Sequence, residues 1–202
     1  MLEVRKTEER FAFEIDWLRT YWSFSFDQYY DPKHVSFGAL RVFNEDFIQP
    51  SRGFDMHPHR DMEIVTYVLS GAIEHQDDTG GHGVIRPGDV QVMTAGTGIV
   101  HAEKNPLAAE VTHLLQVWIL PDRRGHRPRY DQRNFVEEAR RGRILPVASG
   151  RGAPGALEIH QDATYHVGRV EPGAPLSHSL EPSRLAYLHV VKGALSLDGT
   201  AL

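Results

Sequence analysis

The sequence contains no cysteine among its 202 residues. Disulfide bonds, thiolate metal sites and cysteine nucleophiles are therefore excluded, and any metal site must use nitrogen and oxygen ligands. Long apolar runs are also missing, because no stretch approaches the roughly 20 residues that span a membrane. The first residues, "MLEVRKTEERFAFEI", lack the apolar centre of a signal peptide. These absences predict a cytoplasmic protein that does not bind membranes.

Charge and composition narrow the classes of partner further. The formal net charge is −5, with 24% charged and 41% hydrophobic residues, which is typical of a globular protein with a sizeable core. The acidic balance argues against direct nucleic-acid binding. Residues 121–155 hold nine arginines and are compatible with an RNA-binding arm. Their few aromatic residues favour a solvated linker instead, with a short helix over 130–144.

Short β-rich runs separated by turn residues make up most of the chain. The 18 glycines and 12 prolines recur between these runs. Many short strands at such spacing are typical of an antiparallel barrel or sandwich, so an all-β fold is predicted. The candidate strands cover residues 37–44, 62–71, 72–78, 83–89, 90–96 and 111–121.

An internal repeat predicts two β-units. "MEIVTYVLSGAIE" (62–74) aligns with "RLAYLHVVKGALS" (184–196) at an offset of 122 residues. Only nine residues follow Gly193 in the second copy, so its barrel is predicted to be incomplete. The predicted organisation is an N-terminal metal-binding barrel over 1–122, a linker over 123–155 and a C-terminal half without a metal site over 156–202.

Histidine is abundant, with 12 residues, and "MHPHRDME" places two of them one residue apart. On a strand His57 and His59 share one face, while Pro58 indicates a strand end or an edge. His101 and Glu103 repeat the spacing after a glycine-rich turn. A meander of hairpins would bring three imidazoles and one carboxylate together. Alternatively, such a pair simply faces solvent or makes hydrogen bonds, which is the commoner role of histidines on a strand.

Eight further histidines show no comparable pairing. A structural role is predicted for each of them, and a turn position for His82 in "DDTGGHG". This group comprises His75, His82, His113, His126, His160, His166, His178 and His189.

Three stretches together resemble the pirin family of bicupins: "HPHRDMEIVTYVLSGAIEHQD", "GVIRPGDVQVMTAGTGIVHAE" and "LQVWILP". "WSFSFDQYYDP" and "FGALRVFNED" match the same family, so the resemblance extends over residues 4–200. It implies two cupin-type antiparallel β-barrels or sandwiches, the second one incomplete. In ordinary cupins the glutamate of the first motif, here Glu63, is a metal ligand, and an unbroken strand would also turn it inward.

In pirins the ligands are instead the histidines of H-P-H and the histidine and glutamate of H-x-E. The resemblance therefore assigns the metal to His57, His59, His101 and Glu103, and leaves Glu63 as a supporting or core-lining residue. Three imidazoles and one carboxylate suit Fe(II), the preferred metal here, and also Mn, Ni, Co, Cu or Zn. Octahedral geometry would leave two positions open.

The resemblance to bacterial pirins implies a quercetin 2,3-dioxygenase-like enzyme. Such an enzyme opens the ring of a flavonol with O2 and releases carbon monoxide, with Glu103 accepting the proton of the 3-hydroxyl. The alternative is a non-catalytic metal-binding or redox-sensing partner of another protein. A cupin isomerase or sugar-binding barrel is a weaker third reading. The side chains predicted to line a flavonol pocket are Phe54, Met56, Tyr67, Met93 and Trp118.

Overall fold

The structure is a computed structural model that describes residues 2–202. Nearly all regular structure in this range is β, as the pattern of short strands and turns predicted, and only two short helical turns accompany the strands. The elements are η1 (Thr7–Glu9), β1 (Phe11–Glu14), β2 (Leu18–Trp22), β3 (Leu40–Ile48), β4 (Gly53–His59), β5 (Glu63–Ser70), β6 (Ile73–Asp77), β7 (His82–Ile85), β8 (Asp89–Thr94), β9 (Ile99–Lys104), β10 (Thr112–Ile119), β11 (Arg129–Asn134), α1 (Glu137–Arg140), β12 (Ile144–Ser149), β13 (Leu157–Glu158), β14 (Thr164–Gly168), β15 (Ser196–Leu197) and β16 (Thr200–Ala201).

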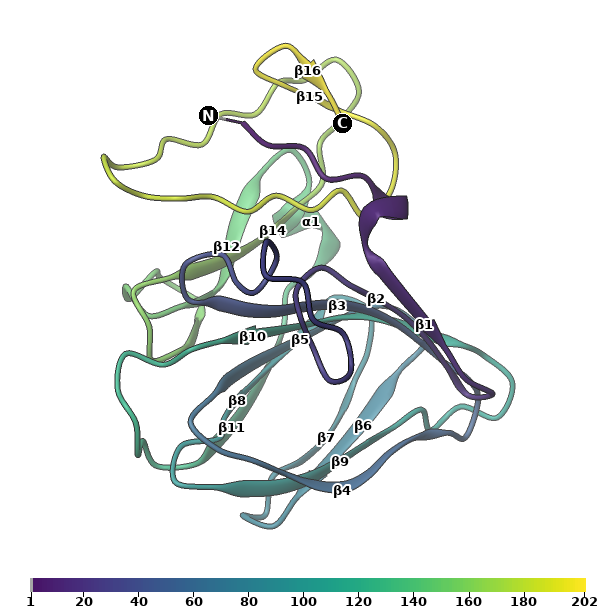
Figure 1. The fold of residues 1–202 in the computed structure, drawn as a ribbon. Helices are drawn as coiled ribbons and strands as arrows, with labels where there is room; N and C mark the ends of the chain where they lie inside the picture. The colour runs from purple at the N-terminus through teal and green to yellow at the C-terminus, as the bar shows by residue number, and fades with distance from the viewer. Residues whose placement is uncertain (1) are drawn as a thin grey trace.

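Two antiparallel sheets face each other and form a sandwich (Figure 1). The larger sheet has the order β1-β2-β3-β10-β5-β8-β11, and the smaller one the order β4-β9-β6-β7. The chain passes repeatedly from one sheet to the other, so β4 and β9 pair although four strands separate them in sequence. The two histidine motifs therefore meet because the chain crosses between the sheets and returns to place β9 beside β4. The predicted meander of hairpins is wrong.

Both faces of the larger sheet are buried in its centre. Ile64 and Val68 of β5 belong to cores between the two sheets, whereas Val65 and Tyr67 pack on the opposite face with Val147 of the second unit. A strand covered on both sides is apolar throughout instead of alternating, which explains the run "IVTYVL" in β5. One continuous core therefore joins the sandwich to the C-terminal unit.

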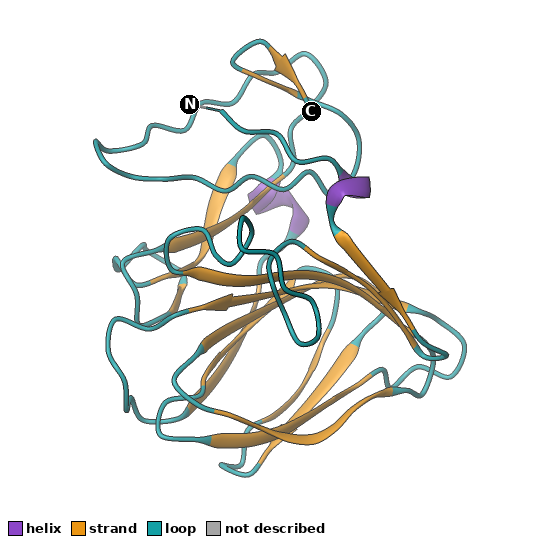
Figure 2. Ribbon diagram, viewed as in Figure 1, coloured by secondary structure: helices purple, strands orange, loops and turns teal. Residues whose placement is uncertain are grey.

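The C-terminal unit lies on the outer face of the larger sheet (Figure 2). It contains a three-stranded sheet, β13-β12-β14, and the hairpin β15-β16. Residues 170–195 form no strand, so the second copy of the repeat, 184–196, does not reproduce the β5–β6 hairpin of the first copy. The second unit is incomplete as a barrel, as predicted.

The predicted helix over 130–144 is wrong for most of its length. Residues 129–134 form β11, which pairs with β8 at the edge of the larger sheet, and α1 is a single turn. The division of the chain at residues 122 and 155 stays a prediction. No helix within residues 2–202 combines the length and apolar character needed to cross a bilayer.

Candidate metal centre

Strand β9 occupies the centre of the candidate site, between β4 and β6 in the smaller sheet. Its side chains alternate, so His101 and Glu103 are buried between the sheets while Val100 and Ala102 lie partly exposed. His101 is opposite His57 of β4, and Glu103 is opposite His75 of β6. The predicted common face of His101 and Glu103 is confirmed, and three neighbouring strands bring imidazoles to it.

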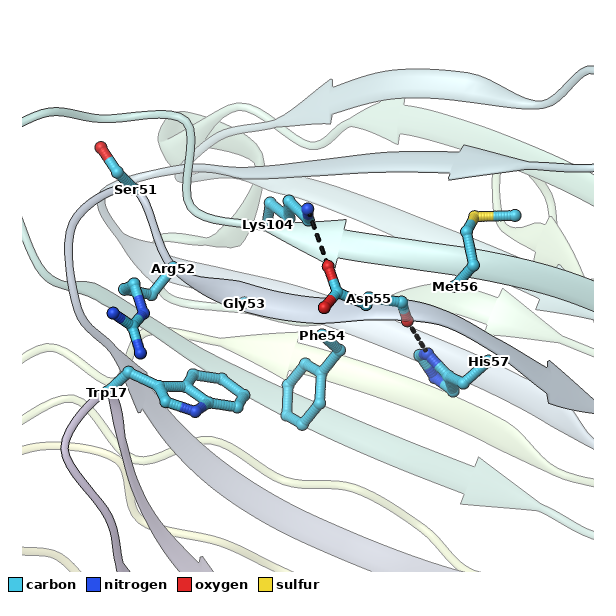
Figure 3. A pocket seen from close by; sticks show the side chains of 9 residues that line it. All are labelled: Trp17, Ser51, Arg52, Gly53, Phe54, Asp55, Met56, His57 and Lys104. Carbon is cyan, nitrogen blue, oxygen red and sulfur yellow. Dashed lines mark hydrogen bonds and ion pairs between the residues drawn. The ribbon is translucent and has the colours of Figure 1, made fainter.

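Strand β4 presents its histidines inward, as the alternation predicted. His57 and His59 are half-buried and Pro58 between them is exposed, on a strand that forms the edge of its sheet. A β-bulge between Phe54 and His57 inserts one residue into β4. Figure 3 shows the consequence: the rings of Phe54 and His57 lie on one side of the strand, and Met56 lies on the other.

The ligand atoms of His57, His59 and His101 all lie within 4.8 Å of one another. A second group, made of His75, His101 and Glu103, meets the same limit and shares His101 with the first. Within residues 2–202 both groups lie in the sandwich and none lies in the C-terminal unit. His75 lacks a paired histidine in the sequence, so a structural role was predicted for it. The register of β6 against β9 places it beside Glu103.

His57 and His101 each keep one ring nitrogen free for a metal. Nδ1 of His57 is 2.7 Å from the Asp55 carbonyl oxygen, to which it donates, so Nε2 remains. Nδ1 of His101 is 3.2 Å from Nδ1 of His75, and its buried Nε2 has no hydrogen-bond partner within residues 2–202. A buried polar atom without a partner is costly, and a metal ion would satisfy it. Imidazole nitrogens beside a carboxylate fit a divalent transition metal.

The electrostatics keep the rings in the form that binds metal. Burial, together with the neighbouring rings of His101 and His57, lowers the pKa of His59 to about 4. Burial likewise lowers the pKa of His101 to about 3, with the rings of His57 and His75 contributing. His59 and His101 are therefore neutral at pH 7, and a neutral imidazole is the ligating form.

Glu103 is held by side chains of the opposite sheet. Gln116 of β10 donates from Nε2 to its carboxylate at 2.6 Å, and Thr66 of β5 donates from Oγ1 at 3.5 Å. Gln116 in turn accepts a hydrogen bond from the indole N–H of Trp118 at 3.1 Å. The ring of Trp118 meets the ring of His59 edge-on at 4.9 Å. The carboxylate orientation is thus linked to the aromatic wall beside the histidines.

Asp77 of β6 makes hydrogen bonds with both of its oxygens. Oδ2 lies 2.9 Å from Nε2 of His75, while Oδ1 accepts from Thr79 and from the backbone N–H of Gly81. Burial alone raises the pKa of Asp77, but the hydrogen bonds from His75, Thr79 and Gly81 outweigh it and lower the pKa. Asp77 is therefore a carboxylate at neutral pH.

Glu63 is fully buried, which agrees with the core-lining alternative predicted for it, but its side chain does not face the histidines. Ile64 and Thr66 are the side chains of β5 that face the smaller sheet, so alternation places Glu63 on the opposite face. There its buried carboxylate accepts a hydrogen bond from Thr94 at 2.9 Å and contacts His160 at 3.2 Å. Glu63 connects the sandwich to the C-terminal unit and does not support the histidine cluster.

The predicted pocket residues also separate by face. Phe54 and Trp118 border the cluster, with ring centroids 6.1 Å from His57 and 4.9 Å from His59, respectively. Met93 is fully buried in the core between the sheets, and Met56 is exposed on the outer side of β4. Tyr67 lies on the far face of the larger sheet, where it accepts a hydrogen bond from Arg140.

A surface hollow of about 620 Å³ adjoins His57 at the β4 edge (Figure 3). Its aromatic side is formed by Trp17 and Phe54, whose rings meet edge-on at 5.0 Å. Its polar side carries the ion pair of Lys104 with Asp55, at 2.9 Å. The lining residues are Trp17, Ser51, Arg52, Gly53, Phe54, Asp55, Met56, His57 and Lys104.

A two-sheet sandwich with histidines and a glutamate gathered on its inner face defines a cupin-type protein with a divalent-metal site. Comparison with family models agrees with this class. The pirin model matches residues 3–119, and the model of the quercetinase C-terminal cupin domain matches residues 146–202. The chain belongs to the pirin family, and the resemblance predicted from its motifs is confirmed.

Relatives cover nearly the whole chain. The quercetin 2,3-dioxygenase of Escherichia coli K12 is 42% identical, over 98% of this chain and 85% of the relative. A relative from Pasteurella multocida is 46% identical, over 100% of this chain and 87% of its own length.

Solved structures show the same fold. The crystal structure of YhhW from Escherichia coli has a TM-score of 0.76 and 45% identity, over 80% of this chain and 68% of that one. A second structure, described as bacterial pirin YhhW in complex with nickel(II), has a TM-score of 0.75 and 46% identity, over 79% and 68%. Together with the His/Glu cluster, this neighbour supports a divalent metal as cofactor.

Proposed function

We propose that this chain is a metal-dependent dioxygenase of the quercetin 2,3-dioxygenase type, which opens the ring of a flavonol with O2. One observation supports this above all others. Three imidazoles converge from two adjacent strands beside a buried carboxylate, and Nε2 of His101 has no hydrogen-bond partner among residues 2–202. The names of the relatives support the choice of reaction.

In this proposal His57, His59, His101 and Glu103 hold one divalent metal, with Fe(II) preferred over Mn, Ni, Co, Cu or Zn. When bound, such an ion acts as a Lewis acid toward a flavonol oxygen and leaves room for O2. The hydrogen bond from Nδ1 of His57 to the Asp55 carbonyl supports the assignment, since ligating imidazoles commonly donate their other N–H.

Glu103 is the proposed base that takes the proton of the flavonol 3-hydroxyl. The hydrogen bonds from Gln116 and Thr66 hold its carboxylate in one orientation between the sheets. The rings of Phe54 and Trp118, on either side of the histidines, are placed to pack against a flat aromatic substrate. The hollow beside His57 provides a way in from the surface.

Turnover tests the proposal directly. The protein is purified with Fe(II), and separately with Mn, Ni, Co, Cu and Zn, and is then mixed with quercetin in air-saturated buffer. We expect flavonol absorbance and O2 to fall together, with one flavonol and one O2 consumed for each carbon monoxide released. Absence of turnover with every metal contradicts the dioxygenase proposal.

The ligand assignment has its own test, His101→Ala. Removal of the central imidazole should abolish stoichiometric metal binding, measured by elemental analysis after dialysis, and should lower turnover by at least about 100-fold. His82→Ala is the matched control, because His82 is exposed on β7 and only pairs with Glu74. Full metal content and full activity in His101→Ala would show the assignment to be wrong.

A further inference from the structure

His75 and Asp77 form a hydrogen-bonded chain that ends on His101. Oδ2 of Asp77 lies 2.9 Å from Nε2 of His75, and Nδ1 of His75 lies 3.2 Å from Nδ1 of His101. All three side chains are buried, with relative exposures of 6% for Asp77, 0% for His75 and 1% for His101. Both β6 residues reach His101 from the side of β9 that is opposite β4. The proposed reaction assigns no role to the hydrogen bonds from Asp77 through His75 to His101.

The Asp77 carboxylate determines where each proton lies in this series of hydrogen bonds. A carboxylate accepts hydrogen bonds and donates none, so Nε2 of His75 must carry a proton. In a neutral ring the other nitrogen is an acceptor, and Nδ1 of His75 therefore takes a hydrogen bond from Nδ1–H of His101. His101 is then left with a lone pair on Nε2, the nitrogen that has no partner.

The turn after β6 prevents Asp77 from rotating. Its Oδ1 accepts from the backbone N–H of Thr79 at 2.8 Å, from the Thr79 hydroxyl at 2.7 Å and from the backbone N–H of Gly81 at 2.9 Å. A Cβ on Gly81 would overlap the Asp77 carboxylate, so glycine is required for this close approach. Only Oδ2 remains for His75.

His75 also belongs to the group of possible ligands with His101 and Glu103. Both of its ring nitrogens are already engaged, one by Asp77 and one by His101, so no lone pair is left for an ion. We propose that His75 and Asp77 are positioning residues, which hold His101 as the Nδ1–H tautomer and keep its Nε2 available to a divalent metal. This inference rests on the proposed function, which makes His101 a ligand.

Asp77→Asn keeps the shape of the side chain but reverses the direction of the hydrogen bonds to His75 and from His75 to His101. The amide oxygen must replace Oδ1, because the N–H groups of Thr79 and Gly81 need an acceptor. The amide nitrogen then faces His75 and donates to it, so each following proton moves and His101 becomes the Nε2–H tautomer. In His75→Gln, by contrast, the side-chain NH2 donates to Asp77 and the carbonyl accepts from His101, so the original tautomer is kept.

The first measurement uses the metal-free protein. Long-range 1H–15N NMR spectra of the histidine rings report which nitrogen carries the proton. We expect the Nδ1–H tautomer of His101 in the wild type and in His75→Gln, and the Nε2–H tautomer in Asp77→Asn. An Nε2–H tautomer in the wild type, or an unchanged tautomer in Asp77→Asn, overturns the proposal whatever the protein catalyses.

The second measurement is a calorimetric titration with Ni(II). Asp77→Asn should weaken the Ni(II) Kd about 10- to 100-fold. His75→Gln should match the wild type. Asp78→Asn should do so too, because it removes the same charge at an exposed neighbour whose carboxylate accepts a hydrogen bond from the backbone N–H of Val100. Wild-type affinity in Asp77→Asn with its tautomer reversed overturns the proposal.

Failure of the inference and failure of the proposed function give different results. A wild-type protein that binds no Ni(II) contradicts the ligand assignment, while the NMR spectra still decide the hydrogen-bonded chain. If Asp77→Asn does not fold, His75→Leu replaces it. Leucine offers His101 no acceptor, so a single Nδ1–H tautomer and unweakened Ni(II) binding in His75→Leu overturn the proposal.

Discussion

At the scale of the residue, Glu103 depends on side chains from the sheet opposite its own. Gln116 has a single amide orientation, because its oxygen accepts from the Trp118 indole and its NH2 donates to Glu103. Thr66 adds a longer hydrogen bond to the same carboxylate. The direction of the Glu103 carboxylate is therefore set by the packing of the two sheets and not by β9 alone.

Replacing Gln116 by methionine tests this dependence. Gln116→Met keeps the side-chain length but removes the donor, so only the longer hydrogen bond from Thr66 still holds Glu103. We expect Ni(II) affinity to fall about 10-fold and the free energy of unfolding to fall by about 1–3 kcal/mol. Calorimetric titration and thermal unfolding measure the two effects. Gln76→Met, at an exposed position of β6, is the control, and equal affinities in both variants would contradict the prediction.

The sequence predicted which residues share a face within one strand, but not across strands. His57 with His59, and His101 with Glu103, were placed correctly because alternation depends only on their separation along one strand. For Glu63 the sequence left a supporting and a core-lining role open, because the direction of its side chain depends on which sheet β5 joins. His75 was missed because its contact with Glu103 depends on the register between β6 and β9, for which the sequence carries no local signal.

At the scale of the element, β4 approaches β9 so closely that a side chain at one position would separate them. A Cβ on Gly53 would lie 2.6 Å from the Cα of Lys104 and would overlap the backbone oxygen of Glu103. Because Gly53 pairs with Lys104 in the same ladder that sets His57 opposite His101, displacement at one end of β4 shifts the histidines.

Gly53→Ala should therefore lower both stability and metal affinity. We expect a loss of about 1–3 kcal/mol in the free energy of unfolding, as for other overpacked sites, together with weaker Ni(II) binding. Met56→Ala, at an exposed position on the same strand, should change neither quantity. Chemical denaturation and Ni(II) titration measure the effects, and a fully stable Gly53→Ala variant would refute the close packing of β4 on β9.

The apolar patterns predict strands that match β5, β8 and β10, but β2 and β12 are missed, and so is the polar strand β11. The sequence of β11, "RYDQRN", predicts part of a linker with a short helix, yet the strand forms the edge of the larger sheet. Its Tyr130 stacks on the ring of His75 at 4.5 Å, so its inward side meets a polar interior and needs no apolar alternation. The repeat at 184–196 fails for the converse reason, since an apolar run forms a strand only beside a partner strand.

At the scale of the whole molecule, Glu45 joins three distant parts of the chain. It pairs with Arg10 at 2.7 Å, His113 at 2.9 Å and His189 of the C-terminal segment at 3.8 Å. Burial raises its pKa, but the hydrogen bonds from His113 and Arg10 outweigh burial and lower the pKa of Glu45 to about 2. Its unfolded value is near 4.5, so the folded state favours the charged form.

The contribution of Glu45 should therefore depend on pH. It is fully present above the unfolded pKa of 4.5 and is lost as pH falls through the folded value of about 2. Glu45→Gln should cost about 2–3 kcal/mol at pH 7, and the difference from the wild type should narrow between pH 4.5 and pH 2. Thermal unfolding across this range measures it, with exposed Glu138→Gln as control. A pH-independent difference would contradict the prediction.

The shared core on the outer face of the larger sheet was not visible in the sequence. The pattern of short strands and turns predicted an all-β protein, and the resemblance carried by the motifs implied a cupin-type fold. The contact of Val147 and Leu157 with Val65 and Val90 depends on how the C-terminal unit docks. This packing brings together residues far apart in the sequence, and the hydrophobic periodicity of the two segments does not predict it.

The open edge of β4 has a consequence for how copies of this chain behave at high concentration. An unpaired edge strand offers backbone N–H and C=O groups to any strand that approaches it, which is a common start of aggregation. Pro58 offers no N–H there, and the bulge near exposed Asp55 breaks the regular spacing. The sheet can therefore leave this side uncovered for small molecules while resisting the addition of another strand.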